Sequence, residues 1–349
     1  MKDLLLEFRS RFDEQLDAFW DTKISHYHTL TTNRNLLDVL AYTKPVSHGG
    51  KRVRPFMAQL TSQRSLDDFT ETEQGYLLAI ELIHVFALIH DDIMDEAATR
   101  HNTSTIHEYV KTNLEANNRA GDLKFQGHMQ AMLVGDLVFW LAGALVVPTP
   151  GRETEFATLR RYFTEVVEHV VMGQMLDFDT ASRDHITDQE LQEKTTNKTA
   201  YYTFVYPLLI GNYLAHAPED DSLLTGIGKS IGFAYQIQDD LLDVLGTNPD
   251  KPHFQDVTNG QHTLMSQHVR QHGSTANKAL LDALWRQPTS PESKVTLLQL
   301  FETSGAIDAA KAVAKAEFDQ ARTDIAKLRH SETARLLTEL CNYLEHREY

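Results

Sequence analysis

Apolar residues recur at steps of three and four positions along most of the chain, which is the spacing of one face of an α-helix. Near the start of the chain this face carries the residues Leu5, Phe8, Phe12, Leu16 and Phe19. The longer apolar segments lack the period-two alternation that is typical of β-strands. Beyond this first helix, the pattern predicts helical structure over residues 73–95, 131–147, 155–178, 188–215, 222–245 and 293–346.

Prolines and polar stretches mark the expected breaks between these helices. Pro55 fits the first turn of a helix, whereas Pro207 lies within a helical pattern and is expected to kink it. Residues 111–127 have the weakest apolar pattern and predict a surface loop, within a polar insertion at about 108–126. Since neither a linker nor a convincing repeat is present, we expect one all-α domain over residues 1–349. Its architecture would be a many-helix bundle with a central active-site cavity.

Two aspartates one helical turn apart follow the apolar segment 81–90. Asp91 and Asp95 share a helix face, and Asp92 points about 100° away from them. Stacked carboxylates destabilise a helix unless a cation neutralises them. Mg²⁺ suits this arrangement, because it binds one or two carboxylates together with phosphate oxygens and water. A solvated acidic helix end would explain a single cluster of this kind equally well.

A second cluster repeats the arrangement after the apolar segment 231–238. Asp239 and Asp243 share a face, and Asp240 lies beside them. If two such helices faced one cavity, the repulsion between their carboxylates would have to be relieved by several bound cations. The pair of clusters is therefore much more specific than either alone, and it predicts a metal site for a phosphate-bearing substrate.

A short basic segment supplies candidate partners for that phosphate. Lys51, Arg52 and Arg54 follow the glycine pair Gly49-Gly50. Glycines let a backbone approach a ligand closely, while Arg offers a fork of donors and Lys a point charge. A solubilising surface loop is the alternative interpretation. In a protein with a formal net charge of −16, an anionic substrate can bind only where metal ions or basic side chains reverse the local field. The concentrated positive charge of this segment therefore favours phosphate binding.

Composition excludes several classes of function. The net charge of −16 opposes a nucleic-acid partner, which needs a basic footprint. The single cysteine, Cys341, rules out an intrachain disulfide and favours a cytoplasmic protein. The first residues mix charges into apolar positions, unlike a signal peptide, and the apolar run 137–147 is too short to span a bilayer. We therefore expect no stable membrane insertion.

The ordered set of motifs resembles the trans-type prenyl diphosphate synthases, also called polyprenyl synthetases. The resemblance runs from about residue 44 to residue 264 and is carried by residues 49–55, 88–95, 135–136, 173–177, 198–199 and 235–243. It implies an all-α fold of the isoprenoid synthase type, usually a homodimer. The implied reaction condenses isopentenyl diphosphate with an allylic diphosphate (dimethylallyl, geranyl or farnesyl), with Mg²⁺ as cofactor and three ions in the site.

The resemblance also implies a role for each motif residue. The metal ligands would be Asp91, Asp92, Asp95, Asp239 and Asp243, with Asp92 and Asp243 in support. Isopentenyl diphosphate would be bound by Lys51, Arg54, His84 and His101, and the allylic diphosphate by Arg100, Lys198, Lys251 and Gln236. The reacting centre would be lined by Asp177, Lys198, Thr199 and Gln236. By its spacing alone, His84 could equally be a core histidine, and His90 is expected to pack or hydrogen-bond locally.

Two positions depart from the family's pattern. His101 stands where an arginine that helps to bind isopentenyl diphosphate is usual, and Gln261 stands where a lysine is usual. Each change removes a permanent positive charge near a phosphate or makes that charge dependent on pH. We therefore expect a weak affinity for isopentenyl diphosphate that improves at lower pH.

Phe86 and Ala87 bear on the length of the product, because they lie five and four residues before Asp91. The growing chain is expected to run beneath the first aspartate cluster, where a bulky side chain forms a floor. An aromatic residue at the first position alone resembles synthases that make geranylgeranyl diphosphate, which is the product we expect. Farnesyl and longer polyprenyl diphosphates remain alternatives, and core packing of Phe86 is nearly as good an explanation.

Three other functions fit parts of the sequence. His90-Asp91 resembles the dyad of HD-type metal phosphohydrolases, but that chemistry needs more histidine ligands and has no use for a second aspartate cluster. A class I terpene cyclase shares the first motif, yet it typically carries an Asn/Ser/Glu motif in place of the second. A non-catalytic regulatory subunit would explain His101 and Gln261, but it has no use for so many repelling carboxylates.

Overall fold

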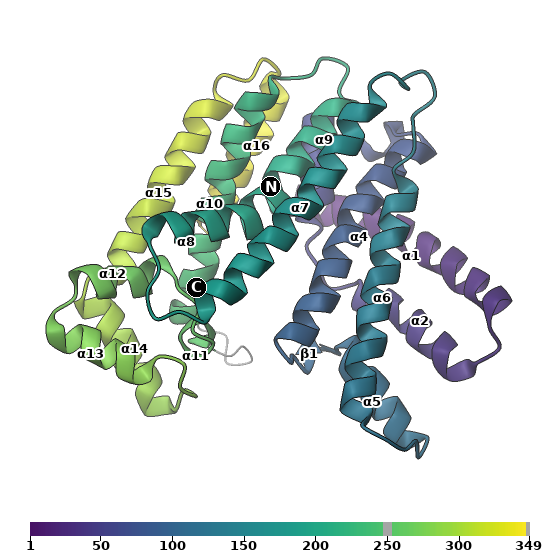
Figure 1. The fold of residues 1–349 in the computed structure, drawn as a ribbon. Helices are drawn as coiled ribbons and strands as arrows, with labels where there is room; N and C mark the ends of the chain where they lie inside the picture. Colours follow the sequence, from purple (N-terminus) through teal and green to yellow (C-terminus); the bar gives the residue numbers. More distant parts are fainter. Residues whose placement is uncertain (247–252, 347–349) are drawn as a thin grey trace. The chain divides into compact units, whose positions relative to one another are not determined.

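The computed structural model describes residues 1–246 and 253–346, which are almost entirely helical (Figure 1). Among these residues the only strands are β1 (Thr99–Arg100) and β2 (Thr103–Ser104), which form a short antiparallel hairpin. The predicted all-α class is confirmed.

Two compact units make up the chain. The N-terminal unit comprises residues 2–59 and 64–160, and the C-terminal unit comprises residue 1, residues 60–63 and the chain from residue 161 onward. That these units act as one domain stays a prediction.

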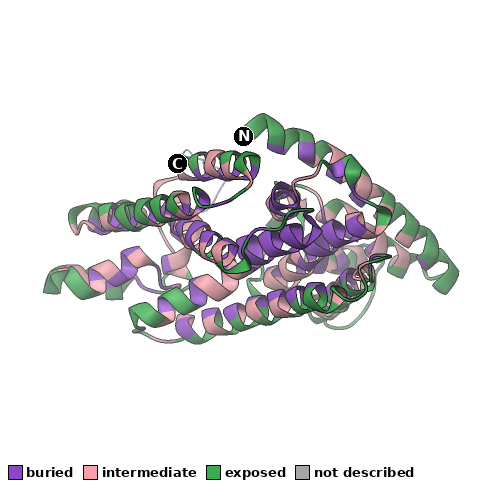
Figure 2. Ribbon diagram, turned by 90° about the horizontal axis from the view of Figure 1, so that it is seen from above, coloured by how far each residue is buried: buried purple, intermediate pink, exposed green. Residues whose placement is uncertain are grey.

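The N-terminal unit is built around one long buried helix, α4 (Glu71–Met94). Tyr76, Leu77 and Leu82 on α4 are fully buried, and a helix that is apolar nearly all round belongs in a core. α1 is instead amphipathic, so buried and exposed residues alternate along it, as Figure 2 shows for the helix at the N-terminus. The other elements of this unit are α1 (Lys2–Leu30), α2 (Arg34–Val46), α3 (Val53–Ser62), η1 (Leu66–Asp68), α5 (Ile106–Ala116) and α6 (Leu123–Leu145), of which α6 packs along α4.

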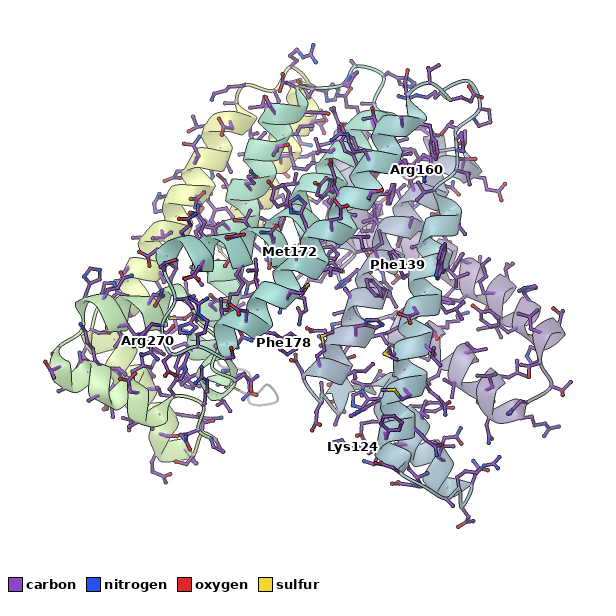
Figure 3. The ribbon with its side chains drawn as sticks, viewed as in Figure 1. Lys124, Phe139, Arg160, Met172, Phe178 and Arg270 are labelled. Carbon is purple, nitrogen blue, oxygen red and sulfur yellow. The ribbon has the colours of Figure 1, made fainter. Side chains whose placement is uncertain are left out.

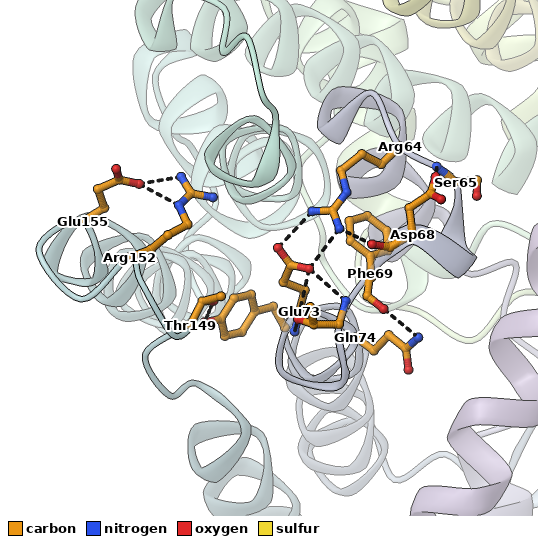
Figure 4. A network of polar contacts seen from close by, with 11 residues as sticks. Arg64, Ser65, Asp68, Phe69, Glu73, Gln74, Thr149, Arg152 and Glu155 are labelled. Atoms are coloured by element: carbon orange, nitrogen blue, oxygen red, sulfur yellow. Dashed lines mark hydrogen bonds and ion pairs between the residues drawn. The ribbon is translucent and has the colours of Figure 1, made fainter.

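A polar network fixes where α4 begins (Figure 4). The Thr70 hydroxyl accepts the backbone N–H of Glu73, and the Glu73 carboxylate accepts the backbone N–H of Thr70 in return. Arg64 adds an ion pair to Glu73 at 2.9 Å. Because an α-helix rises about 1.5 Å per residue, this start places Asp91 about 30 Å further along the helix axis.

The prediction of a surface loop over residues 111–127 is wrong. α5 continues to Ala116 and α6 begins at Leu123, so a short connection alone separates them. Ile106 and Val110 are buried on one face of α5, at 2% and 1% exposure. The residues between them are mostly polar, so this four-residue period is weak in the sequence.

The C-terminal unit surrounds α10 (Asp221–Leu245), which packs against α15, α16, α9 and η2. Leu224, Ile231 and Leu241 on α10 are fully buried. The predicted segment 293–346 is divided by short turns into α14 (Pro291–Thr303), α15 (Ala306–Ile325) and α16 (Ser331–Glu345). The remaining helices are α7 (Phe156–Ala181), α8 (Asp188–Thr195), α9 (Tyr206–Leu214), α11 (Gln255–Thr258), α12 (Leu264–His272) and α13 (Thr275–Leu284).

The predicted helix over residues 188–215 is interrupted by a π-helix, η2 (Thr196–Val205). α8 leads into η2, and α9 follows it with Pro207 in its first turn. Proline has no N–H to donate, so it fits a helix start. At Pro207, where the sequence predicts a kink, the structure has the change from η2 to α9. π-Helical segments are rare in proteins, and many of those that occur lie at functional sites. Lys198 and Thr199, both predicted site residues, lie within η2.

Within the described part of the chain, α6 is the one helix that is long and apolar enough to cross a membrane by length and composition. Polar residues interrupt the apolar positions of α6, so the uninterrupted apolar run in the sequence covers only residues 137–147. Leu133 and Trp140 on α6 are 62% and 74% exposed. Core helices of soluble proteins pass the same test, so this is weak evidence for a membrane, but it leaves an apolar face to be explained.

Candidate active site

The predicted site residues fall into two sets, one in each compact unit. The first set surrounds the basic loop of the N-terminal unit. Gly49 adopts a left-handed φ of 92°, and a Cβ at this position would lie 2.7 Å from the His101 side chain. Only glycine therefore lets the loop lie against the β1–β2 hairpin, which carries Arg100 and His101.

Arg52 is not available to a phosphate, so this part of the prediction for the basic segment is wrong. Its side chain is 1% exposed, and its guanidinium forms ion pairs with Glu81 at 2.6 Å and with Asp13 at 2.7 Å. Arg52 therefore anchors the loop to α4 and α1. Lys51 and Arg54 remain as the loop's candidate phosphate ligands.

His84 lies half-buried on α4 among the basic groups of this unit. Burial lowers the pKa of His84 well below its usual value, and four neighbours lower it further: Arg54, Arg52, Arg100 and His101. All four groups therefore lie near one imidazole, and the shared role of Arg54, His84 and His101 in binding a diphosphate stays a prediction. His84 is neutral in this setting, so it can offer a hydrogen bond but no charge.

The first aspartate cluster lies at the end of α4 and contacts Arg100. The Asp92 carboxylate is 2% exposed and accepts a hydrogen bond from Arg100 Nε at 2.5 Å, while Asp91 lies 3.4 Å from Arg100 Nη2. Burial raises the pKa of Asp92 to about 6, although Arg100 opposes this. Asp95, at the helix end, is exposed. The main contact of Asp92 is thus Arg100, and its place among the metal ligands stays a prediction.

Phe86 packs against two other rings before the first aspartate cluster. Its ring centroid lies 5.1 Å from that of Phe139 and 4.8 Å from that of His90. Phe139 is labelled on α6 in Figure 3. His90 also hydrogen-bonds the Met132 carbonyl at 3.3 Å, which confirms its predicted local role. Ala87 adds no bulk beside Phe86. The two phenylalanines therefore form an aromatic pair between α4 and α6.

The second set of site residues surrounds Asp177 on α7. Asp177 is 7% exposed and forms ion pairs with Lys198 at 2.5 Å and with Lys194 at 3.2 Å. Burial by itself raises the pKa of Asp177, but the two lysines outweigh it and hold the value below its usual range. A Cβ at Gly173 would lie 2.3 Å from the backbone nitrogen of Lys198. Glycine at this position therefore lets η2 approach α7 and brings Lys198 to Asp177.

A chain of hydrogen bonds joins η2 to the second aspartate cluster. The Thr199 hydroxyl donates to Gln236 Oε1 at 2.7 Å, and Gln236 Nε2 donates to the Asp240 carboxylate at 2.9 Å. Burial raises the pKa of Asp240 to about 7, against the effect of the Gln236 donor. The sequence predicts that Thr199 and Gln236 share a site. The structure adds that Gln236 lies between Thr199 and Asp240 in this chain of hydrogen bonds.

Asp243 on α10 and Asp256 on α11 extend this cluster. The Asp243 carboxylate accepts the backbone N–H groups of Gln255 at 3.0 Å and of Asp256 at 3.1 Å, so it caps the short helix α11. Burial raises the pKa of Asp256 well above its usual value, and Asp240 and Asp243 raise it further. Sequence reasoning missed Asp256, because a lone aspartate in a polar segment carries no spacing signal.

The donors in both units suit magnesium. In the residues that the structure describes, no group of three or more His, Cys, Asp and Glu side chains is already arranged around a metal position. Mg²⁺ does not require one, because it takes one or two carboxylates and completes its shell with water and phosphate oxygens. The crowding of Asp240, Asp243 and Asp256 is a repulsion that a divalent cation relieves. Lys251, the remaining predicted cation, lies outside the described residues.

In each unit, carboxylates and basic side chains lie together on helices, which suits the binding of a phosphate-bearing substrate. The model of the polyprenyl synthetase family matches residues 35–301, and the chain belongs to this family. It is therefore a prenyltransferase, and the phosphohydrolase and terpene cyclase readings of its motifs are set aside.

Individual relatives agree with this assignment. The chain is 28% identical to a short chain isoprenyl diphosphate synthase of Methanothermobacter thermautotrophicus, over 87% of this chain and 88% of that one. It is 29% identical to a geranylfarnesyl diphosphate synthase of Natronomonas pharaonis, over 86% and 87%. A crystal structure of geranylgeranyl pyrophosphate synthase from Corynebacterium glutamicum, complexed with isoprenyl diphosphate and magnesium, has a TM-score of 0.88 at 25% identity, covering 98% and 99%. The predicted isoprenoid synthase fold is thereby confirmed.

Proposed function

We propose that the protein is a trans-prenyl diphosphate synthase that condenses isopentenyl diphosphate with an allylic diphosphate, and that geranylgeranyl diphosphate is its main product. The observation that carries the proposal is the carboxylate cluster at the end of α10, where Thr199 and Gln236 lead by hydrogen bonds to Asp240, and Asp243 accepts the backbone N–H of Asp256. Such a cluster is costly in a metal-free protein, and it suits a site that binds cations together with a diphosphate.

The reaction breaks the allylic C–O bond, so that pyrophosphate leaves, and the double bond of isopentenyl diphosphate then attacks the allylic carbon. The proton that is lost afterwards goes to the departing pyrophosphate. Basic side chains stabilise the charge that develops on the leaving group, and this role falls to Arg100, Lys198 and Lys251. Gln236, Thr199 and Asp177 orient the allylic substrate. Isopentenyl diphosphate is held for attack by Lys51, Arg54, His84 and His101.

We assign three Mg²⁺ ions to the reaction. Their proposed ligands are Asp91 and Asp95 in the N-terminal unit, with Asp92 in support, and Asp239 in the C-terminal unit, with Asp243 in support. When bound, Mg²⁺ supplies Lewis acidity to the diphosphate oxygens. The magnesium of the Corynebacterium structure supports this cofactor. In this chain Asp92 keeps Arg100 in place, and Asp243 holds α11 against α10.

One assay tests the proposed function. Purified protein is incubated with Mg²⁺, isopentenyl diphosphate and each allylic primer in turn, and the products are identified by mass spectrometry. We expect geranylgeranyl diphosphate. Failure to elongate any primer would refute the synthase and favour a regulatory subunit, whereas a farnesyl or longer product would refute only the assigned length.

Phe86→Ala is expected to lengthen the products. The substitution removes the ring that packs on Phe139 at 5.1 Å, so it opens space beneath the first aspartate cluster. Phe139→Ala should act in the same direction, while Phe125→Ala on the exposed side of α6 should leave the products unchanged. Chromatography of the dephosphorylated products measures the distribution. If both Phe86→Ala and Phe139→Ala keep the original distribution, Phe86 only packs the core.

His101→Arg is expected to lower the KM for isopentenyl diphosphate at least about tenfold, because a charge-assisted hydrogen bond contributes about 1.5–3 kcal/mol and about 1.4 kcal/mol is tenfold. The KM of the unmodified protein should fall from about pH 8 to pH 6 as the imidazole gains its proton, and that of the variant should not. Initial rates at saturating allylic substrate measure both. A KM that is flat over this range and indifferent to the substitution would count against the role of His101.

We further propose that the enzyme is a cytoplasmic homodimer and that the exposed apolar face of α6 takes part in the subunit contact. Leu133 and Trp140 are both more than half exposed there, and apolar patches of this kind mark interaction sites. Trp140→Glu is expected to shift the protein toward a monomer in light scattering after size exclusion, while Lys124→Gln at the start of α6 should not. A wild-type protein that is already monomeric would contradict the proposal.

A further inference from the structure

Lys194 is a buried lysine to which the proposed reaction gives no role. It lies in the last turn of α8, and its side chain is 9% exposed. Its ammonium lies 3.2 Å from the Asp177 carboxylate, 3.1 Å from the His262 carbonyl and 3.3 Å from Gln261 Oε1. The three donors of the ammonium thus meet three oxygen acceptors from α7 and from the segment that follows α11.

Negative charge converges on this ammonium. Besides its direct partner Asp177, Asp240 and Asp256 lie close enough for Lys194 to oppose the rise of their pKa values. A buried ammonium is strongly unfavourable unless it is paired, and a buried carboxylate cluster is unfavourable without a cation. Lys194 therefore offsets part of the negative charge of the acidic cluster, and removing it leaves Asp177 paired with Lys198 alone.

Gln261 lies beside Lys194 in the segment that follows α11. Its side chain is uncharged, so this segment supplies no positive charge at position 261. In the structure the Lys194 ammonium donates to the Gln261 amide oxygen. A positive charge is thus present beside position 261, although it comes from α8.

We propose that Lys194 supplies, from α8, the positive charge that the acidic cluster requires beside position 261, and that it is a positioning residue that holds Asp177 for the reaction. The inference rests on the proposed function, since the carboxylates concerned belong to the proposed diphosphate site. It also explains why Gln261 does not leave the cluster without a cation.

A purely structural role makes a different prediction. If Lys194 only fastened the end of α8 through the His262 carbonyl, a charge restored at position 261 would not replace it, because that bond would still be missing. Moving the charge from one backbone position to the other therefore separates the two explanations. The variants are Lys194→Met, Gln261→Lys and the combination of both, with Lys315→Met as a control that removes an exposed lysine from α15.

Two measurements are made on each full-length variant. The first is the melting temperature in the presence of EDTA, which reports on the cluster without metal or turnover. The second is kcat and the KM of the allylic substrate with Mg²⁺. For Lys194→Met we expect a melting temperature lower by about 5 °C, since the buried Asp177 carboxylate loses one of its two lysine partners. We also expect kcat at least about tenfold lower, since a misplaced Asp177 no longer orients the reacting groups.

The combined variant decides the question. Recovery of most of the melting temperature and of kcat in Lys194→Met/Gln261→Lys supports the proposal, also if Lys194→Met alone fails to fold. It is overturned if the combined variant is no better than Lys194→Met, or if Lys194→Met behaves like the Lys315→Met control. If the unmodified protein makes no prenyl diphosphate, the proposed function fails, but the melting temperatures still show whether position 261 can take over the charge of Lys194.

Discussion

Asp239→Asn is expected to lower kcat by about 100- to 1,000-fold, which is the usual cost of losing one preorganised electrostatic contact to a developing charge. Asparagine keeps the shape of the side chain but removes the negative charge that a magnesium ion needs. The effect should be on kcat more than on the KM of isopentenyl diphosphate, because that substrate is assigned to the basic residues of the other unit. Steady-state rates over a range of Mg²⁺ concentrations measure both.

Asp308→Asn is a matched control for this variant. Asp308 is an exposed aspartate on α15 in the same compact unit, so the two substitutions change charge equally. The control should keep kcat within about twofold, as expected for a surface substitution. A comparable kcat for Asp239→Asn and Asp308→Asn, at any Mg²⁺ concentration, would remove Asp239 from the metal site.

Arg52→Met is expected to lower the free energy of unfolding by about 3–5 kcal/mol, because it leaves a buried carboxylate without its partner. Glu81 has a side chain that is 2% exposed and is paired with Arg52 at 2.6 Å. The substitution should also loosen the basic loop from α1 and α4, so the KM of isopentenyl diphosphate should rise in parallel. Equilibrium unfolding in urea measures the stability.

Two further variants separate this effect from the loss of a charge alone. Lys51→Met changes an exposed residue of the same loop and should cost less than about 1 kcal/mol. Arg52→Met/Glu81→Met removes both members of the buried pair and should recover part of the lost stability. If Arg52→Met unfolds at the same urea concentration as Lys51→Met, the ion pair does not anchor the loop.

Long periodic segments could be predicted from the sequence because the helical spacing is repeated many times within each of them. The buried helix α4 and the start of α10 follow the predicted ranges closely. The errors occur where the signal is short or mixed. The sequence pattern predicts a loop over residues 111–116, which are helical in the structure, because apolar and polar positions are mixed there. It also predicts one helix over 293–346, because the turns that divide this segment are too short to interrupt the helical spacing.

Some residues of the candidate site could likewise be found from the sequence, and others could not. Clusters such as Asp91-Asp92 are visible in the sequence because their members are neighbours. In the structure Lys198 reaches Asp177 and Thr199 reaches Gln236, and their place at the reacting centre stays a prediction. The sequence gives no means of telling which cation of a basic segment is buried. Arg52 was therefore grouped with phosphate ligands, although tertiary contacts pair it internally. Lys194 and Asp256 were missed for a similar reason, since only the fold brings them together with Asp240.

The π-helix η2 limits where related proteins can gain or lose residues. Its backbone hydrogen bonds join residues five positions apart, one more than in an α-helix. Deleting a single residue between Thr199 and Val205 would rotate Lys198 by about 100° relative to α9, away from Gly173 and Asp177. Insertions and deletions of one residue should therefore be rare within Thr196–Val205 and common in the short connection between α5 and α6, where no site residue depends on the register.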